Sequence, residues 1–269
     1  MVDILRFIFS RFGPQPVPAS FTLSSATESN VLVVSEGSTG TSLLFLTAVT
    51  AAAELGLKVI FFTHNAFQKF PVCLQSIPNL NPDSLKRIRF VYSKTLDELL
   101  HDVASLHELL AKAAAPPSLL VVDGLERYLR EAGTRSTPLK GDRSAAAHLA
   151  ALLHDTATFF TQNHAPCRVM ASFRLNQDSR ETSCPDPLLA VLDRYLQVRC
   201  TLTQERRGLP AEAEEQAVWQ VFLSGLGIRT GPVDAVSHWS LGIGPNGAMQ
   251  FSPAISPEEH PETQQTVSV

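Results

Sequence analysis

Cysteine is scarce in this sequence, and the four that occur form no CxxC pair: Cys73, Cys167, Cys184 and Cys200. Their scatter argues against a zinc site and a disulfide framework, so we expect reduced, partly buried thiols in an intracellular protein and no structural metal. Long apolar runs are also missing, which excludes a membrane-spanning helix. The formal net charge is only −4. No overall positive field therefore attracts nucleic acid, and any DNA contact must come from a local basic patch.

What the sequence does contain is ample material for a folded core. It has 269 residues, of which 44% are hydrophobic and 18% charged, as one large domain or two small ones would need. From residue 30 onward, short apolar runs alternate with helical patterns. The strand candidates are 30–34, 58–62, 88–92, 118–122 and 168–173, and the helix candidates are 43–55, 95–113 and 143–162. The alternation predicts an α/β fold, a mainly parallel twisted sheet flanked by helices.

Beyond residue 188 the pattern changes to strands without long helices between them. The strand candidates there are 195–202, 216–223, 237–243 and 248–252, and Asn246-Gly247 predicts a tight hairpin between the last two. We therefore expect an antiparallel C-terminal extension of the parallel sheet. The polar segments 131–142 and 176–187 are predicted to be mobile loops.

The two ends of the chain differ in character from this core, which we place at residues 30–252. Residues 253–269 are rich in proline and acids and predict a disordered tail. Residues 1–29 form an N-terminal extension whose first part, residues 1–12, is apolar and basic. Asp3 and the prolines at 14, 16 and 18 argue against a clean amphipathic helix there. A segment that packs on the domain or on a partner is favoured over an organelle-targeting signal.

A glycine-rich turn follows the first strand candidate and leads into the first helix candidate. Its residues are Gly37, Ser38, Thr39, Gly40, Thr41 and Ser42. A strand, a glycine-rich turn, a hydroxyl residue and a helix make up a phosphate-binding loop, whose backbone N–H groups bind phosphate. The segment is one residue short of GxxxxGK[ST], and Thr41 stands where that motif has lysine. The alternative is an ordinary turn in which Ser or Thr caps the helix.

Asp123 comes directly after the apolar strand candidate 118–122. An acid at that position is costly unless it is paired or bound to a metal. Together with Ser42 it could approach Mg²⁺, which makes ATP-Mg the cofactor that this pair of segments would bind. The alternative is that Asp123 caps a helix starting at residue 124. Glu36, beside the glycine-rich turn, is expected to add negative charge where phosphate would sit.

The order of these elements resembles the RecA-type recombinase core, a P-loop followed by an acid-tipped strand and an antiparallel edge. Several stretches are similar to the SWIM-domain-associated ATPase of the animal Shu complex, a divergent recombinase paralogue: 86–92, 98–99, 107–108, 120–129 and 151–157. The resemblance runs from about residue 30 to about 252. It implies a nuclear protein of homologous recombination, DNA repair and meiosis. It further implies a SWIM-type zinc-finger partner, single-stranded DNA binding and support of recombinase filaments.

The resemblance also implies an ATPase, but two of the family's features are absent. The P-loop lysine is replaced by Thr41, and the glutamate that orients water in recombinase ATPases has no counterpart in Phe62-Thr63-His64-Asn65. We therefore expect a degenerate site with slow or undetectable turnover. The alternative is a genuine ATPase stimulated by single-stranded DNA. A small-metabolite kinase is a third interpretation, but it lacks a recognisable base and an arginine-rich lid. Asn176 and Gln177 are candidate sensors of the γ-phosphate.

Two further sets of residues are candidate binding sites. Phe45 and Ala48 match the Phe-x-x-Ala pattern through which recombinases dock on neighbours, although both would also be good core residues. The local basic candidates for DNA are Arg135, Lys140, Arg143 and Arg174. Few aromatic residues lie among them, so binding would be driven by phosphate contacts and would depend strongly on salt. Their alternative role is as solvated surface charges.

Overall fold

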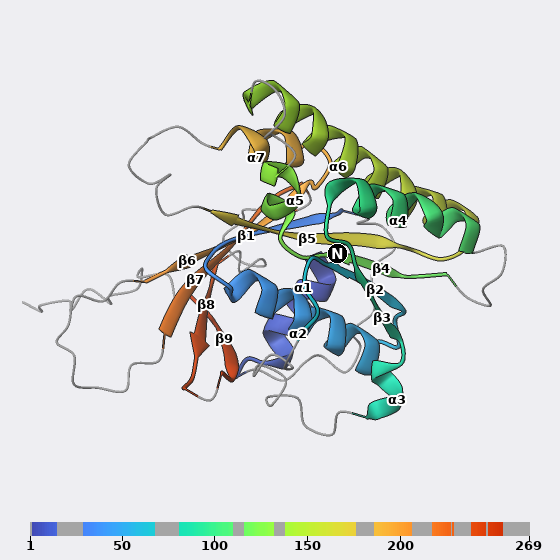
Figure 1. Ribbon diagram of the computed structural model, residues 1–269. Coiled ribbons are helices and arrows are strands. Elements are labelled where there is room, and N and C mark those ends of the chain that lie inside the picture. Colours follow the sequence, from blue (N-terminus) through green and yellow to red (C-terminus); the bar gives the residue numbers. More distant parts are fainter. Residues whose placement is uncertain are drawn as a thin grey trace, which may run out of the picture.

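The computed structural model describes residues 2–14, 29–67, 81–109, 116–131, 138–175, 186–205, 217–226, 228, 238–245 and 247–254. The side chains of residues 109, 131 and 138–141 lie outside this description. Within these ranges a nine-stranded sheet carries helices on both faces (Figure 1).

The sheet has a parallel part and an antiparallel part, as the sequence predicts. The parallel strands are β1 (Val31–Glu36), β2 (Val59–Thr63), β3 (Ile88–Tyr92), β4 (Leu119–Val122), β5 (Arg168–Leu175) and β6 (Val198–Gln204). They are followed by β7 (Ala217–Gly225), β8 (His238–Ile243) and β9 (Met249–Pro253), which pair antiparallel. The strand order is β3-β2-β4-β5-β1-β6-β7-β8-β9. The central strands β4, β5 and β1 are thus neighbours, although they are far apart in the sequence.

Helices cover the two faces unequally. The helices are α1 (Val2–Arg11), α2 (Thr39–Ala53), α3 (Pro82–Leu85), α4 (Leu96–Leu109), α5 (Leu125–Glu131), α6 (Pro138–Asn163) and α7 (Pro187–Leu192). Figure 1 shows α4, α5, α6 and α7 on one face and α1 and α2 on the other. Each face has its own buried hydrophobic cluster.

Two local sequence signals are confirmed at atomic detail. At the start of α4, Thr95 Oγ1 accepts a hydrogen bond of 3.2 Å from the Glu98 N–H, while Glu98 Oε2 accepts one of 2.7 Å from the Lys94 N–H, a capping-box arrangement. Between β8 and β9, the Gly244 N–H donates to the Ala248 carbonyl at 3.0 Å. Gly247 has φ +72° there. That left-handed conformation favours glycine and sets the hairpin turn.

Several predicted boundaries are wrong. Strand β1 continues to Glu36 and α2 begins at Thr39, so most of the glycine-rich segment is the first turn of the helix and not a loop. Helix α6 begins at Pro138, and residues 138–142, predicted as a loop, are helical. Proline is well suited to the first turn, where its missing N–H has no partner to lose. Segments 132–137 and 176–185, and the predicted tail from residue 255, lie outside the described residues.

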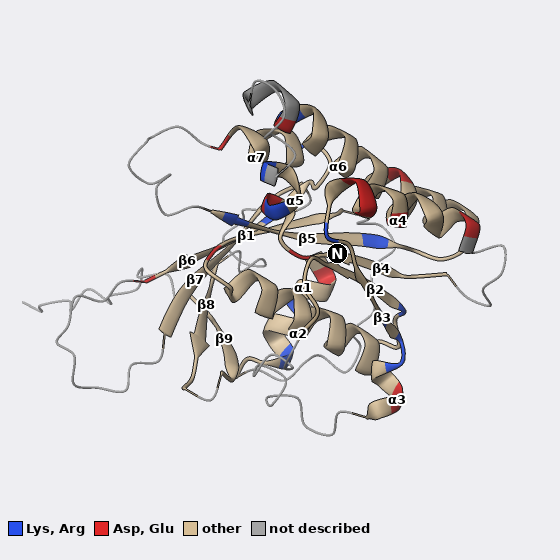
Figure 2. Cartoon of the chain, viewed as in Figure 1, with Lys and Arg blue, Asp and Glu red and all other residues tan. Residues whose placement is uncertain are grey.

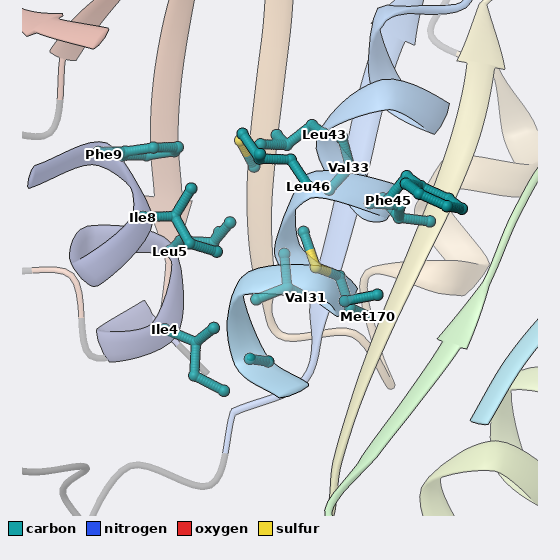
Figure 3. Packing of buried hydrophobic residues seen from close by; sticks show 14 of the residues in the cluster. Ile4, Leu5, Ile8, Phe9, Val31, Val33, Leu43, Phe45, Leu46 and Met170 are labelled. Atoms are coloured by element: carbon teal, nitrogen blue, oxygen red, sulfur yellow. The ribbon is translucent and has the colours of Figure 1, made fainter. Parts of the chain in front are cut away.

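Helix α2 is apolar on every side, which requires cover on every side. Its sequence contains no charged residue, and Figure 2 shows it tan along its whole length. The sheet covers one side and α1 covers another (Figure 3). Side chains Ile4, Leu5 and Ile8 of α1 point toward α2 and are fully buried. The N-terminal segment therefore packs on the domain, as one of the sequence alternatives expects.

The prediction that residues 1–12 form no clean amphipathic helix is wrong, because Val2–Arg11 form helix α1. Asp3 lies in the first turn of α1, where a negative charge favours the helix dipole, and the prolines lie beyond its last residue. The ring of Phe9 stacks on Phe251 of β9 with centroids 4.6 Å apart, and the Phe251 N–H donates to the Phe12 carbonyl at 2.9 Å. The first helix is thereby joined to the last described strand.

Candidate functional site

The carboxyl ends of β1, β4 and β5 bring polar residues together over the start of α2. Side chains alternate between the two faces of a strand, and Val33, Val121 and Met170 pack in the cluster on the α2 side. Two residues further along β1 and β5, and directly after β4, the same face carries Ser35, Ser172 and Asp123. All three side chains are buried.

Asp123 is held by hydroxyl groups from two other elements. Its Oδ1 accepts a hydrogen bond of 2.7 Å from Thr41 Oγ1 on α2 and one of 3.0 Å from Ser172 Oγ on β5. The Gly124 N–H donates to Ser172 Oγ at 2.8 Å. Asp123 is only 5% exposed, so these bonds offset the cost of burying a carboxylate. Among the described residues, none bonds Oδ2.

The turn between β1 and α2 is short, and its two glycines have separate structural roles. Gly37 has φ +69°, and one residue later Ser38 leads into the helix at Thr39. The Gly40 N–H donates to Ser35 Oγ at 3.1 Å, and a Cβ on Gly40 would lie 2.5 Å from that oxygen. Gly37 therefore provides a left-handed turn, and Gly40 allows close packing of helix on strand.

The N-terminus of α2 still presents donors to an anion. The Ser38 side chain makes no capping hydrogen bond, but Ser35 Oγ accepts the Gly40 N–H, so the capped turn stays an alternative explanation of the segment. Within the described residues, the backbone N–H groups of Ser38, Thr39 and Thr41 also make no hydrogen bond. Unpaired N–H groups and the helix dipole favour negative charge at this end. Ser42 lies in the same turn and is half-buried.

Strand geometry does not support the expected role of Glu36. Ser35 faces α2, so the next residue of β1 faces the opposite side of the sheet, where Val34 packs with the other hydrophobic cluster. In register, Glu36 pairs with Leu175. Its carboxylate therefore does not share the face on which Thr41 meets Asp123.

The predicted DNA-binding residues occupy different environments. Arg143 is exposed on α6, whereas Lys140 lies in α6 without a described side chain and Arg135 lies outside the described residues. Arg174 is on β5, half-buried, in register with Ser35. DNA binding by these residues stays a prediction. Asn176 and Gln177 lie outside the described residues.

The Phe-x-x-Ala residues lie in the core. Phe45 and Ala48 are each 1% exposed, and the Phe45 ring packs against three other rings at centroid distances of 5.1 to 5.9 Å: Phe61, Phe67 and Phe90. This is the packing that the alternative interpretation of the motif expects. A docking role for the two residues stays a prediction.

Sequence reasoning missed Ser172 and Ser35 as members of the site. Each is a hydroxyl residue that follows a run of apolar residues within its strand, and that signal was available. Among the described residues, β2 ends at Thr63, and His64 Nδ1 lies 3.1 Å from Asn65 Oδ1, so the end of this strand carries no carboxylate there.

Other kinds of site are not found in the part of the chain that the structure describes. No three His, Cys, Asp or Glu side chains gather there as metal ligands, and none of the described helices is long and apolar enough to span a bilayer. A cavity of about 350 Å³ lies on the antiparallel extension, lined by Gly13, Ser240 and Gln250 among others. None of its lining residues belongs to the Asp123 site.

Comparison with known proteins gives two kinds of match, while no family model matches the chain. ATPase SWSAP1 of Mus musculus is 34% identical over 223 residues, covering 80% of this chain and 70% of the relative. ATPase SWSAP1 of Homo sapiens is 34% identical over 224 residues, covering 83% and 88%. Among solved structures, the KaiC-like protein PH0186 of Pyrococcus horikoshii OT3 has a TM-score of 0.56 at 13% identity, covering 91% of this chain and 95% of that one.

The structural match confirms a RecA/KaiC-like core with an antiparallel C-terminal extension. Identity above 30% over most of both relatives goes beyond a shared fold. The chain therefore belongs to the family of ATPase SWSAP1.

Proposed function

We propose that this chain is a recombinase-paralogue subunit that supports homologous recombination in DNA repair, with a nucleotide site that binds ATP-Mg weakly and turns it over slowly or not at all. Family membership and the RecA/KaiC-like fold support the first part. The 2.7 Å hydrogen bond from Thr41 to Asp123 carries the second part.

The residues at the start of α2 offer hydrogen-bond donors to a phosphate-bearing ligand but no positively charged side chain. Unpaired backbone N–H groups and the helix dipole would hold phosphate, and Ser42 with Asp123 would hold Mg²⁺. Bound Mg²⁺ would neutralise part of the phosphate charge. Thr41 has no charge to add, and its hydroxyl is already donated to Asp123. The first turn of α2 therefore contributes backbone N–H groups but no cation, which favours weak binding.

Turnover needs a group that orients water, and the described residues of the site include no evident candidate. The strand next to β4 ends in Thr63, and the residues that follow, His64 and Asn65, contact each other. Without a carboxylate there, and without a lysine, neither the attacking water nor the developing charge is stabilised. The bound nucleotide would therefore stabilise the fold or a subunit interface.

The partners in this proposal follow from the family and from local charge. They are a SWIM-type zinc-finger protein, a RecA-like recombinase and single-stranded DNA in the nucleus, within a Shu-type complex active in repair and meiosis. Exposed Arg143 near the start of α6, with Lys140 and Arg135 close to it in sequence, supports a phosphate-contacting patch.

Thermal unfolding with ATP-Mg, combined with steady-state hydrolysis with and without single-stranded DNA, tests the proposal. We expect the melting temperature to rise with millimolar ATP-Mg, because the ligand binds the native state alone, and turnover to stay near background. Rapid DNA-stimulated turnover that Asp123→Asn abolishes would instead establish the genuine ATPase. Asp155→Asn, an exposed acid on α6, is the matched control.

A further inference from the structure

We propose that Arg174 supplies, from strand β5, the positive charge that the missing lysine would have given to phosphate groups at the N-terminus of α2. The inference rests on the proposed binding of nucleotide. Arg174 would provide the cation that the first turn of α2 lacks.

The alternation of β5 places Arg174 on the α2 face of the sheet. Ala171, Phe173 and the partly buried Leu175 pack with the cluster on the opposite face. Met170 packs with α2, and Ser172 reaches Asp123 on that same side. Arg174 continues this row, about 6 to 7 Å beyond Ser172 along the strand.

The register of β5 with β1 brings Arg174 beside the first turn of α2. Arg174 pairs with Ser35, and Ser35 Oγ accepts the Gly40 N–H. The Cβ of Ser172 lies 3.7 Å from where a Cβ on Gly40 would stand. Two strand neighbours of Arg174 therefore touch the helix turn that carries the unpaired N–H groups.

Within the described part of the chain, the guanidinium of Arg174 makes no ion pair. Its Nε is buried and has no hydrogen-bond partner there, although an arginine stays charged at any physiological pH. A buried N–H of this kind is costly unless a ligand accepts from it. The backbone N–H of Arg174 donates to Glu126 Oε2 at 2.9 Å and fixes the end of the strand.

The two arginines of α5, Arg127 and Arg130, differ from Arg174 because each lies beside an acid. Arg130 Nη2 donates to Asp186 at 3.3 Å, and its guanidinium lies 5.6 Å from the Phe173 ring centre. Arg127 lies 4.0 Å from Glu126. Their charges are already matched by acids, whereas that of Arg174 faces the side of the sheet on which phosphate would lie.

A guanidinium fork suits phosphate, because it donates two parallel hydrogen bonds to two oxygens. The ligand recognised by Arg174 is thus the polyphosphate, not the nucleoside. Truncation of Arg174 should weaken binding of ATP-Mg and leave binding of adenosine unchanged.

Calorimetric titration of the full chain with ATP-Mg and with adenosine tests this assignment. Arg174→Ala should weaken ATP-Mg binding about tenfold to a hundredfold, and Arg174→Lys should retain part of it. Arg194→Ala, an exposed arginine just after α7, should bind as the wild type does. If Arg174→Ala fails to fold, Arg174→Gln keeps most of the side-chain volume without the charge.

The double variant Arg174→Ala with Thr41→Lys adds a test that a structural role would not pass. A lysine at position 41 returns the charge from the helix side, so it should recover most of the lost ATP-Mg affinity. Wild-type binding that persists unchanged in both Arg174→Ala and Arg174→Gln would overturn the assignment alone. No binding of millimolar ATP-Mg by the wild type would overturn the proposed nucleotide site and the assignment with it.

Discussion

Thr41 and Asp123 lie 82 residues apart in the sequence and share a hydrogen bond of 2.7 Å. The bond joins the first turn of α2 to the end of β4, at the position where a P-loop lysine would stand. Thr41 occupies the position of a residue that would give positive charge to a ligand, but its hydroxyl links α2 to the end of β4. Asp123 therefore has a structural role in the absence of nucleotide.

Replacing Asp123 should lower stability even without ligand. Asp123→Ala leaves the hydroxyls of Thr41 and Ser172 without their acceptor, and we expect a loss of about 1 to 3 kcal/mol in the free energy of unfolding. Urea denaturation of the apo chain measures it. Asp123→Asn keeps an acceptor oxygen and should lose less. An unchanged midpoint for Asp123→Ala would show that the two bonds contribute nothing.

A charge at Phe45 should unfold the domain. The side chain is 1% exposed and packs among phenylalanine rings, and Phe-to-Ala changes in such cores cost about 3 to 5 kcal/mol. Phe45→Glu adds a buried charge to that loss. Circular dichroism during thermal unfolding reports the change, with Tyr92→Glu at an exposed position of β3 as control. A folded Phe45→Glu variant that no longer binds recombinase would instead support docking.

Removing the ring of Phe9 should destabilise the whole domain. Phe9 is fully buried between Phe251 and Trp239, with ring centroids 4.6 and 5.5 Å away. Phe9→Ala should cost about 3 to 5 kcal/mol, measured by the urea midpoint at constant slope. Phe222→Ala, which truncates a ring that is 39% exposed, should change the midpoint little. Equal shifts in the two variants would contradict the packing of α1.

The buried thiols predict an alkaline loss of stability. Burial raises the pKa of Cys167 and of Cys200 from 9.0 to about 12. Between these values the unfolded chain has released protons that the folded chain keeps, so the free energy of unfolding falls as pH rises. The slope approaches about 1.4 kcal/mol per pH unit for each thiol. Urea unfolding from pH 8 to 10.5 measures it, and Cys200→Ala should flatten the slope.

Arg143 provides a test of the DNA patch. Arg143→Ala should weaken single-stranded DNA binding at every sequence and reduce the slope of log affinity against log salt by about 0.7. Fluorescence anisotropy across a salt series measures both quantities. Arg194→Ala is the matched control. Wild-type binding with a flat salt dependence would contradict a phosphate-driven interface.

Much of the fold could be predicted because its signals are local. Strand β3 and the β8–β9 hairpin follow from alternation and from Asn246-Gly247, and the start of α4 follows from Thr95 and Glu98. The start of α2 could not be predicted, because Gly37 and Gly40 are typical of a loop. The structure shows that Gly40 is instead required by the close approach of Ser35 to the helix. That approach is a tertiary contact between strand and helix.

The site was predictable in part for the same reason. Asp123 was found from its position after an apolar strand, whereas Ser172 depends on which strands are neighbours. The order β4-β5-β1 sets β5 between the two halves of the site, and no local sequence pattern predicts strand order.

The uniform apolarity of α2 was the signal that another element, α1, packs on it, since a helix without a polar face needs a second layer of cover.

The contact of α1 with β9 also governs how the chain is made. Helix α1 is synthesised before the sheet, whereas Trp239 and Phe251, on which Phe9 packs, follow only after most of the sheet. Until then the ring of Phe9 lacks its final cover. The nascent chain therefore exposes an apolar ring of α1 that must be shielded from aggregation until β8 and β9 have been synthesised.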